Sequence, residues 1–236
     1  VNNQKIQIFN EKDPTKLPWK DLGVDIVFES SGHFLSKEQA SKHLMAGARK
    51  VVISAPSTND SADATICYGV NNQVYNQNMA VISTASCTTN CIAPIAKIIN
   101  DNFGIKKALV TTIHSYTNDQ NLLDLPHKDK RRSRAAALSL IPTTTGAARA
   151  IALVLPELKN KFDGIAIRVP TPNVSLVDMV VEVQKDASAE QINGLFEIYS
   201  KSSFKGILDI CYEPLVSIDF NGSSYSSIVD AKNTMV

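Results

Sequence analysis

The first third of the chain alternates apolar, strand-like runs with an amphipathic helical segment, and this pattern restricts the folds that it can adopt. Val24–Phe28, Lys50–Ser54 and Ala80–Thr84 each have the length and apolar content of a buried strand. Ser36–Ala46 has helical spacing, and Ser36 is suited to cap the start of that helix. Strands that alternate with helices form parallel sheets, because the chain crosses over between neighbouring strands. We therefore predict an α/β fold with a parallel, doubly wound sheet.

Polar residues stand where such sheets bind their ligands. Ser31, Gly32 and Ser54 come directly after or at the end of two of the predicted strands. Ligands of doubly wound sheets bind beyond the carboxyl ends of the strands, so these residues are candidate ligand contacts. An earlier run, Lys5–Phe9, also has the pattern of a short strand.

The second part of the chain has longer strands with fewer helices between them. Strands are predicted at Ile105–His114, Gly164–Val169 and Ser175–Val183, and helices at Gly146–Leu155 and Ser188–Lys201. Long strands with few intervening helices indicate a mostly antiparallel sheet faced by helices. We therefore predict one domain over residues 1–86 and a second over residues 87–236.

A cysteine lies where the last strand of the first part ends and a helix begins. Cys87 follows the run Ala80–Thr84, and Ile92–Asn102 has helical spacing with its apolar residues on one stripe. The start of a helix offers unpaired N–H groups and the positive end of the dipole, and both lower the pKa of a thiol. We therefore expect Cys87 to ionise to the thiolate that attacks electrophiles.

A histidine is placed to serve as the proton partner of this thiol. His114 ends a predicted strand, and it can meet Cys87 across the floor of a pocket to give an activated nucleophile. Spacing alone leaves open a buried thiol capped by polar neighbours. The remaining histidines, His33, His43 and His127, lack a comparable partner, and we interpret them as surface or loop residues.

Composition and charge exclude several classes of protein. With 24 basic and 23 acidic residues the chain is nearly neutral, which predicts no bulk attraction to nucleic acid or membrane. The basic run Lys128–Arg134 is open to interpretation as a solvated loop, an anion-binding segment or a subunit contact.

Four cysteines form no disulfide framework in a chain of this size, which favours a reducing cytoplasm. No second Cys or His pair with ligand spacing accompanies Cys87 and Cys91, so we predict no metal site. No apolar run approaches the ~20 residues of a membrane span.

Four motifs follow one another along the chain: Ala85–Pro94 (ASCTTNCIAP), His114–Gln120 (HSYTNDQ), Pro142–Ala148 (PTTTGAA) and Arg168–Ser175 (RVPTPNVS). Together they resemble the phosphorylating glyceraldehyde-3-phosphate dehydrogenases, and the resemblance extends over essentially the whole chain. It implies that residues 1–86 are the rear half of a Rossmann-type NAD-binding domain and that residues 87–236 belong to a catalytic domain. The glycine-rich turn of the NAD fingerprint does not occur in this sequence, from which we expect an internal fragment.

The resemblance implies an oxidoreductase of glycolysis. The expected reaction is the NAD-dependent oxidative phosphorylation of D-glyceraldehyde 3-phosphate to 1,3-bisphosphoglycerate, carried out by a cytoplasmic homotetramer. Cys87 matches the nucleophile, which forms a hemithioacetal and then a thioester, and His114 matches the residue that activates it. The site for the substrate's own phosphate matches Thr117, Arg132 and Arg168, and the site for the attacking phosphate matches Ser86, Thr88, Thr145 and Gly146. The NAD contacts match Lys12, Ser31, Gly32, Ser54 and Asn118.

Three other functions are compatible with parts of the sequence. Erythrose-4-phosphate dehydrogenase shares the Cys–His core, but the intact motifs Tyr116–Asn118 and Thr145–Gly146 favour the triose enzyme. A Cys–His hydrolase would leave His114 without an Asn or Asp that orients it, and the first third of the chain without explanation. A non-enzymatic role in binding RNA or a partner protein rests on Lys128–Arg134 alone, and we predict no dedicated nucleic-acid site.

Overall fold

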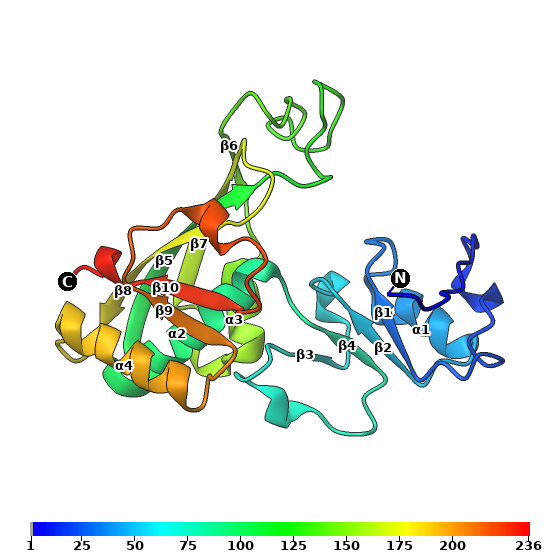
Figure 1. Cartoon of the computed structure of the whole chain (residues 1–236), viewed down its shortest axis with the longest axis horizontal. Helices are drawn as coiled ribbons and strands as arrows, with labels where there is room; N and C mark the ends of the chain where they lie inside the picture. Colours follow the sequence, from blue (N-terminus) through cyan, green and yellow to red (C-terminus); the bar gives the residue numbers. More distant parts are fainter. Residues whose placement is uncertain (1) are drawn as a thin grey trace. The chain divides into compact units, whose positions relative to one another are not determined.

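A computed structural model describes residues 2–236 and divides the chain into two compact units (Figure 1). The first unit consists of the residues up to Ile66 together with Asn72–Ala85. The second consists of Cys67–Asn71 and Ser86–Val236. Val1, with which the first predicted domain begins, lies outside the described residues.

The first unit is built on a parallel sheet. Its strands lie in the order β1-β2-β4-β3, and every neighbouring pair is parallel. The strands are β1 (Ile26–Glu29), β2 (Lys50–Ile53), β3 (Ala64–Thr65) and β4 (Val81–Ser83). The predicted parallel sheet is therefore confirmed, and β3 is an addition that the sequence did not indicate.

Helix α1 (Lys37–Met45) packs on this sheet, as the sequence predicts. Ser36 caps it: its hydroxyl accepts a hydrogen bond from the Gln39 backbone N–H at 3.1 Å, and the Gln39 side chain accepts one from Ser36 N–H at 3.3 Å. This reciprocal pair satisfies two donors that the start of a helix leaves unpaired. Ala40 of the helix is fully buried against Val51 and Val81, and this small apolar cluster is the core of the unit.

The strand predicted at Lys5–Phe9 is wrong. The structure gives this segment no regular secondary structure, and Ile6 and Ile8 are 61% and 90% exposed. A strand is stable only beside a partner that pairs with its backbone N–H and C=O groups. Among the described residues, no strand borders the outer edge of β1 or pairs with this segment.

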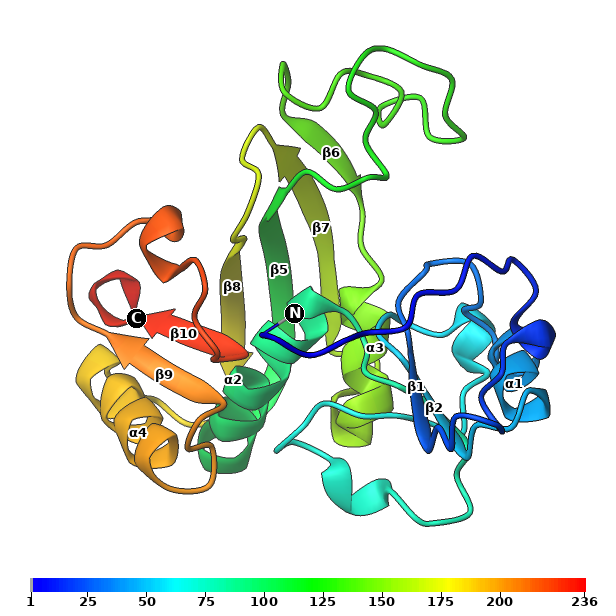
Figure 2. The same ribbon diagram turned by 45° about the vertical axis from the view of Figure 1, so that its right-hand side comes forward.

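The second unit contains a four-stranded sheet in the order β6-β7-β5-β8 (Figure 2). The pairs β5–β8 and β6–β7 are antiparallel, whereas β5–β7 is parallel, so the prediction of a mostly antiparallel sheet is confirmed. Two further strands, β9 and β10, pair in parallel as a separate small sheet that the sequence did not predict. The strands are β5 (Ile105–Ser115), β6 (Ile141–Thr144), β7 (Phe162–Val169), β8 (Leu176–Val183), β9 (Leu208–Cys211) and β10 (Ser227–Asp230).

Helices cover one face of the four-stranded sheet. The helices of this unit are α2 (Cys87–Phe103), α3 (Ala147–Val154) and α4 (Ala189–Lys201). Helix α2 packs on β5 and β8, α3 packs on β7, and α4 packs on β9 (Figure 2). Short 3-10 helices complete the chain at Pro14–Lys16, Thr58–Asp60, Asn72–Val74, Pro156–Leu158, Ser217–Phe220 and Ala231–Asn233.

The alternation of burial along β5 follows from this arrangement. Ala108, Val110 and Thr112 point to the helix-covered face and are buried, whereas Leu109 between them is 63% exposed. Successive side chains of a strand point to opposite faces, so one face of the sheet forms the core of the unit and the other is uncovered in this chain.

Replacing Ser188 with alanine is expected to lower the free energy of unfolding by about 1 kcal/mol, because it removes the N-cap of α4. The Ser188 hydroxyl accepts a hydrogen bond from Gln191 N–H at 3.3 Å, and Ser188 N–H donates to the Gln191 side chain at 2.9 Å. Urea unfolding measures the effect, with Ser203→Ala, an exposed site after the helix, as the control. Equal midpoints for the two variants would contradict the capping argument.

Candidate active site

The start of helix α2 presents Cys87. Ser86 is the N-cap, and its hydroxyl accepts a hydrogen bond from Thr89 N–H at 3.0 Å. Cys87 is thus the first residue of the helix, and it is exposed. Both the backbone N–H and the side chain of Thr88 form hydrogen bonds with its sulfur. Donors of this kind favour the thiolate over the neutral thiol.

His114 meets this cysteine from strand β5. Its Nε2 lies 3.3 Å from Cys87 Sγ, so the structure brings the two predicted catalytic residues together. The hydrogen bond to His114 lowers the pKa of the Cys87 thiol by more than desolvation raises it, and the charge of the imidazole and the Thr88 hydrogen bonds act in the same direction. The imidazole therefore contributes more to the lowered pKa than the Thr88 hydrogen bonds do.

The other cysteines differ from Cys87 in their surroundings. Burial raises the pKa of the Cys67 thiol to about 12. Burial also raises the pKa of Cys91, whose sulfur lies 3.6 Å from the Ser227 hydroxyl. Both therefore remain neutral thiols near pH 7, whereas the surroundings of Cys87 favour its thiolate.

Brief treatment with limiting iodoacetamide is expected to label Cys87 first, because the alkylating agent reacts with thiolate. Mass mapping of the labelled peptides measures the distribution. A His114→Asn variant removes the main cause of the lowered pKa, so its alkylation at neutral pH should be slower by about tenfold and should require a higher pH. Predominant labelling of Cys67, Cys91 or Cys211, or equal pH profiles in the two proteins, would contradict the assignment.

Arg168 lies beside the histidine on the neighbouring strand. The register of β5 and β7 places it opposite His114, and its Nη1 lies 2.7 Å from His114 Nδ1 and donates to Ser115 O at 2.9 Å. Its Nε is buried without a hydrogen-bond partner among the described residues. Burial, followed by the nearby charge of Arg132, lowers the pKa of this guanidinium. A half-buried arginine with a buried, unpaired donor is suited to bind an anion.

The guanidinium of Arg132 forms ion pairs with two carboxylates, Asp119 and Asp129, that we did not predict from the sequence. Its Nη1 forms a close ion pair with Asp119, and its Nε donates to Thr143 Oγ1 at 2.8 Å and lies 3.6 Å from Asp129 Oδ2. Asp119 lies within the HSYTNDQ motif, so its position in that motif was the available signal. The pairing holds the guanidinium of Arg132 in place near Arg168.

The remaining predicted anion-binding residues lie at loop and helix starts. Thr117 and Asn118 are exposed after β5, and the backbone N–H of Thr117 donates to the buried Gln120 side chain at 3.0 Å. Thr145 Oγ1 accepts from Ala147 N–H at 3.2 Å, and Gly146 is the N-cap of α3. Helices α2 and α3 pack against each other, and each begins with predicted phosphate contacts.

The predicted cofactor residues of the first unit lie at the carboxyl ends of β1 and β2. Ser54 Oγ donates to Glu29 O at 3.3 Å and lies 3.0 Å from Ser30 Oγ. Ser31 is bound to the Glu29 side chain, and Gly32 has a φ of +77° with open space where a Cβ would stand. Exposed hydroxyls and backbone N–H groups at this edge suit the hydroxyl, amide and phosphate groups of a dinucleotide. Lys12 is exposed in the loop before Pro14.

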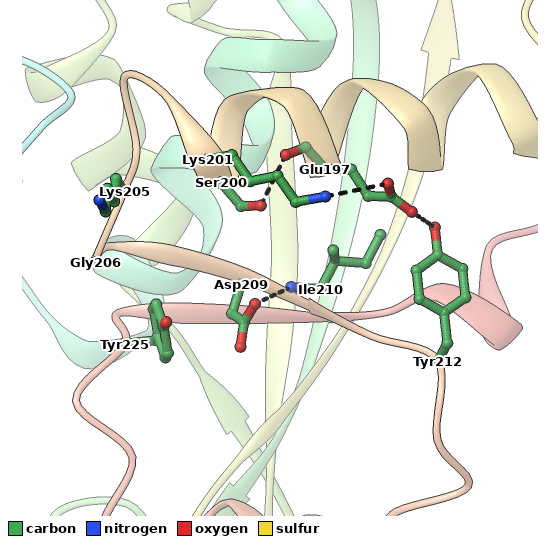
Figure 3. Close-up of a pocket in the computed structure, with 9 residues that line it drawn as sticks. All are labelled: Glu197, Ser200, Lys201, Lys205, Gly206, Asp209, Ile210, Tyr212 and Tyr225. Carbon is green, nitrogen blue, oxygen red and sulfur yellow. Dashed lines mark hydrogen bonds and ion pairs between the residues drawn. The ribbon is translucent and has the colours of Figure 1, made fainter.

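The cleft against α4 and β9 contains none of the predicted site residues. Its volume is about 530 Å³, and within it the Tyr212 hydroxyl donates to Glu197 at 2.6 Å and Lys201 Nζ lies 3.7 Å from the same carboxylate (Figure 3). In residues 2–236, no three His, Cys, Asp or Glu side chains are grouped to hold a metal ion.

A lowered-pKa cysteine beside a histidine is the arrangement expected for thiol catalysis, and a parallel sheet with polar strand ends is the arrangement expected for nucleotide binding. Comparison with known families agrees. The family described as "Glyceraldehyde 3-phosphate dehydrogenase, C-terminal domain" matches residues 86–236, and the family described as "Glyceraldehyde 3-phosphate dehydrogenase, NAD binding domain" matches residues 1–37. The chain belongs to the glyceraldehyde 3-phosphate dehydrogenase family.

Individual relatives support this membership over the whole chain. Glyceraldehyde-3-phosphate dehydrogenase 1 of Bacillus cereus is 55% identical over 100% of this chain and 70% of its own length. The enzyme of Geobacillus stearothermophilus is 56% identical with the same coverage. A chloroplastic glyceraldehyde-3-phosphate dehydrogenase of Arabidopsis thaliana, GAPA1, is 53% identical over 100% of this chain and 59% of its own length.

Proposed function

We propose that this protein oxidises D-glyceraldehyde 3-phosphate to 1,3-bisphosphoglycerate with NAD and inorganic phosphate, as a glycolytic oxidoreductase. The observation that carries the proposal is the 3.3 Å contact between Cys87 Sγ and His114 Nε2, together with the lowered pKa of the thiol. The family and the relatives described above support the same reaction.

In this mechanism Cys87 is the nucleophile and His114 the proton carrier. The thiolate adds to the aldehyde carbon, and the carbonyl oxygen takes the proton held at His114 Nε2 to give a hemithioacetal. His114 then accepts the hydroxyl proton as the carbon loses a hydride, which leaves a thioester on the sulfur. The hydride acceptor is NAD, which is the chemistry that this cofactor supplies when it is bound. Inorganic phosphate attacks the thioester carbon, the carbon–sulfur bond breaks and the thiolate is restored.

Two sets of donors serve the two phosphate groups. Arg168 binds the phosphate of the substrate in this proposal, because its Nε is buried and has no hydrogen-bond partner among the described residues. Thr117 and Arg132 contribute to the same site. Ser86, Thr88, Thr145 and Gly146 bind the attacking phosphate, for which the starts of α2 and α3 provide backbone N–H groups.

In the division that we propose, residues 1–86 are the rear half of the NAD-binding domain and residues 87–236 are the catalytic domain. The first unit lies within residues 1–86, although Cys67–Asn71 and Ser86 group with the second unit. Ser31, Gly32 and Ser54 hold the cofactor at the carboxyl ends of β1 and β2, where the exposed hydroxyls and the open Gly32 backbone support this role. Lys12 and Asn118, both exposed, add polar contacts.

The enzyme is a homotetramer of the cytoplasm in this proposal. The uncovered face of the β5-β7-β8 sheet supports assembly: Leu109 and Val180 are direct cross-strand neighbours there and are 63% and 65% exposed. Ile165 on β7 and Leu176 on β8 are also exposed. A sheet face that exposes several large apolar side chains is typical of a subunit interface. No helix in the described part of the chain is long and apolar enough to cross a membrane.

Absorbance of NADH tests the reaction. Purified full-length protein is mixed with glyceraldehyde 3-phosphate, NAD and inorganic phosphate, and sustained NADH formation is expected to require all three. Omission of phosphate should limit the reaction to about one turnover per site, because the thioester is then not released. Preference for erythrose 4-phosphate over the triose phosphate, or NADH formation that does not depend on phosphate, would contradict the proposal.

A further inference from the structure

Glu29 is a buried carboxylate at the end of β1, and both of its oxygens are engaged. The residue is 4% exposed. Oε1 accepts a hydrogen bond from Ser31 N–H at 2.7 Å and a short one from the Ser31 hydroxyl. Oε2 lies 2.9 Å from Nε2 of His43. A buried charge is tolerated only when it is satisfied in this way. Burial would raise the pKa of Glu29, but the bonds from Ser31 and His43 outweigh it and hold that pKa below its usual value.

His43 was interpreted from the sequence as a surface or loop residue, and the structure corrects this. It lies in α1, is 5% exposed, and is stacked on the ring of Trp19 at a centroid distance of 6.3 Å. Trp19 Nε1 lies 3.1 Å from His43 Nδ1. The indole N–H can only donate, so Nδ1 is the acceptor and carries no proton. The proton of the neutral ring is therefore on Nε2, from which it is donated to Glu29.

This chain of hydrogen bonds ends at the predicted cofactor loop. The Ser31 hydroxyl gives its one hydrogen to Glu29 and accepts from His33 N–H at 3.1 Å, so any further partner of this oxygen must be a donor. The backbone carbonyl of Glu29 also accepts from Ser54 N–H at 3.0 Å. Glu29 thus contacts both segments to which we assign NAD binding.

We propose that Glu29 is a positioning residue for the cofactor, and that Trp19 and His43 fix its orientation so that the Ser31 hydroxyl is presented to NAD as an acceptor. The inference rests on the proposed role of Ser31, Gly32 and Ser54 in holding NAD. The cofactor groups that such an acceptor receives are ribose hydroxyls or the amide N–H of the nicotinamide. Glu29 itself does not touch the cofactor.

The directions of the donors make a specific prediction for Glu29→Gln. If the amide oxygen faces Ser31, the amide N–H₂ faces the N–H of His43, and two donors oppose each other. If the amide is reversed, its N–H₂ faces Ser31 N–H instead. If the proton of His43 moves to Nδ1, then Nε2 can accept from the amide, but the Nδ1–H and the Trp19 N–H become two donors that oppose each other. The conflict disappears only when the indole N–H is removed as well, which Trp19→Phe does.

Calorimetric titration of the full-length protein with NAD tests the proposal. Glu29→Gln is expected to raise the Kd for NAD by about tenfold, which corresponds to about 1.4 kcal/mol. Its kcat at saturating NAD should stay within about twofold, because the reacting groups are unchanged. The control Glu38→Gln, which removes an exposed carboxylate from α1, should bind NAD as the unmodified protein does. Adding Trp19→Phe to Glu29→Gln should recover most of the lost affinity.

The outcomes separate this inference from the proposed function. Failure of the unmodified protein to bind NAD would contradict the proposed function before any variant is made. If it binds, equal Kd values for Glu29→Gln and Glu38→Gln would overturn the positioning role, and so would a double variant that binds no better than Glu29→Gln. Should Glu29→Gln fail to fold, Trp19→Phe on that background is expected to restore folding and binding, and failure to restore them would equally overturn the proposal.

Discussion

Replacing Cys87 with alanine is expected to reduce kcat by at least about 10⁴-fold, the largest effect of any single substitution in this chain. Removing a covalent nucleophile eliminates the thioester route entirely, and what remains is binding without an equivalent reaction path. The binding of NAD to the variant should be unchanged within about twofold, since the residues assigned to the cofactor are retained. Steady-state kinetics and a calorimetric titration measure the two quantities.

Cys91→Ala is the matched control, because it removes the other thiol of the same helix, one that burial keeps neutral. Its kcat should remain within about threefold of the unmodified enzyme, with any loss arising from the small cavity that it leaves. Comparable losses for Cys87→Ala and Cys91→Ala would show that α2 contributes structure and not a nucleophile.

Replacing Arg168 with alanine is expected to lower kcat/KM for glyceraldehyde 3-phosphate by about 100-fold, because a charged hydrogen-bond donor to the substrate phosphate is lost. For glyceraldehyde without the phosphate the loss should be smaller, of about tenfold or less. The loss on this second substrate is not zero, because Arg168 also contacts His114 and Ser115 O. Parallel kinetics on the two aldehydes measure the difference.

Arg134→Ala serves as the control for Arg168→Ala. Its guanidinium forms an exposed ion pair with Asp124 at 3.1 Å, and pairs of this kind contribute little. It should leave kcat/KM on both aldehydes nearly unchanged. If Arg168→Ala lost the same factor on both aldehydes, its role would be to hold His114 in place and not to bind the phosphate.

Features that depend on neighbouring residues could be predicted from the sequence. Ser36 and Ser188 begin their helices as expected, because a capping box involves residues only three positions apart. The position of Cys87 at the start of α2 follows from the same local signals. The parallel and mostly antiparallel sheets follow from the spacing of strand-like and helical runs.

Features that depend on distant residues could not be predicted in this way. Lys5–Phe9 has a strand-like pattern but no partner strand among the described residues, and local pattern carries no information about partners. The burial of His43 depends on Trp19 and Glu29, which lie 24 and 14 positions away. A charged residue at the end of an apolar strand was the one local sign that Glu29 has a buried partner.

The candidate site divides in the same manner. Proximity of Cys87 and His114 was expected because a helix start and a strand end can meet. The resemblance of the motifs to a known family indicated which cysteine and which histidine to expect there. The carboxylate that holds Arg132 and the contact of Arg168 with His114 depend on the register of β5 and β7 and on the path of a long loop. A short motif contains no information about the strand register or the path of the loop.

Mass spectrometry of the trapped thioester tests the central claim most directly. The protein is mixed with glyceraldehyde 3-phosphate and NAD in the absence of inorganic phosphate, quenched in acid, and digested for peptide mapping. A 3-phosphoglyceroyl group is expected on the peptide that contains Cys87, in an amount equal to the NADH formed, and it should be lost when phosphate is added before the quench. NADH formation without an adduct at Cys87, or an adduct at Cys91, Cys67 or Cys211, would contradict it.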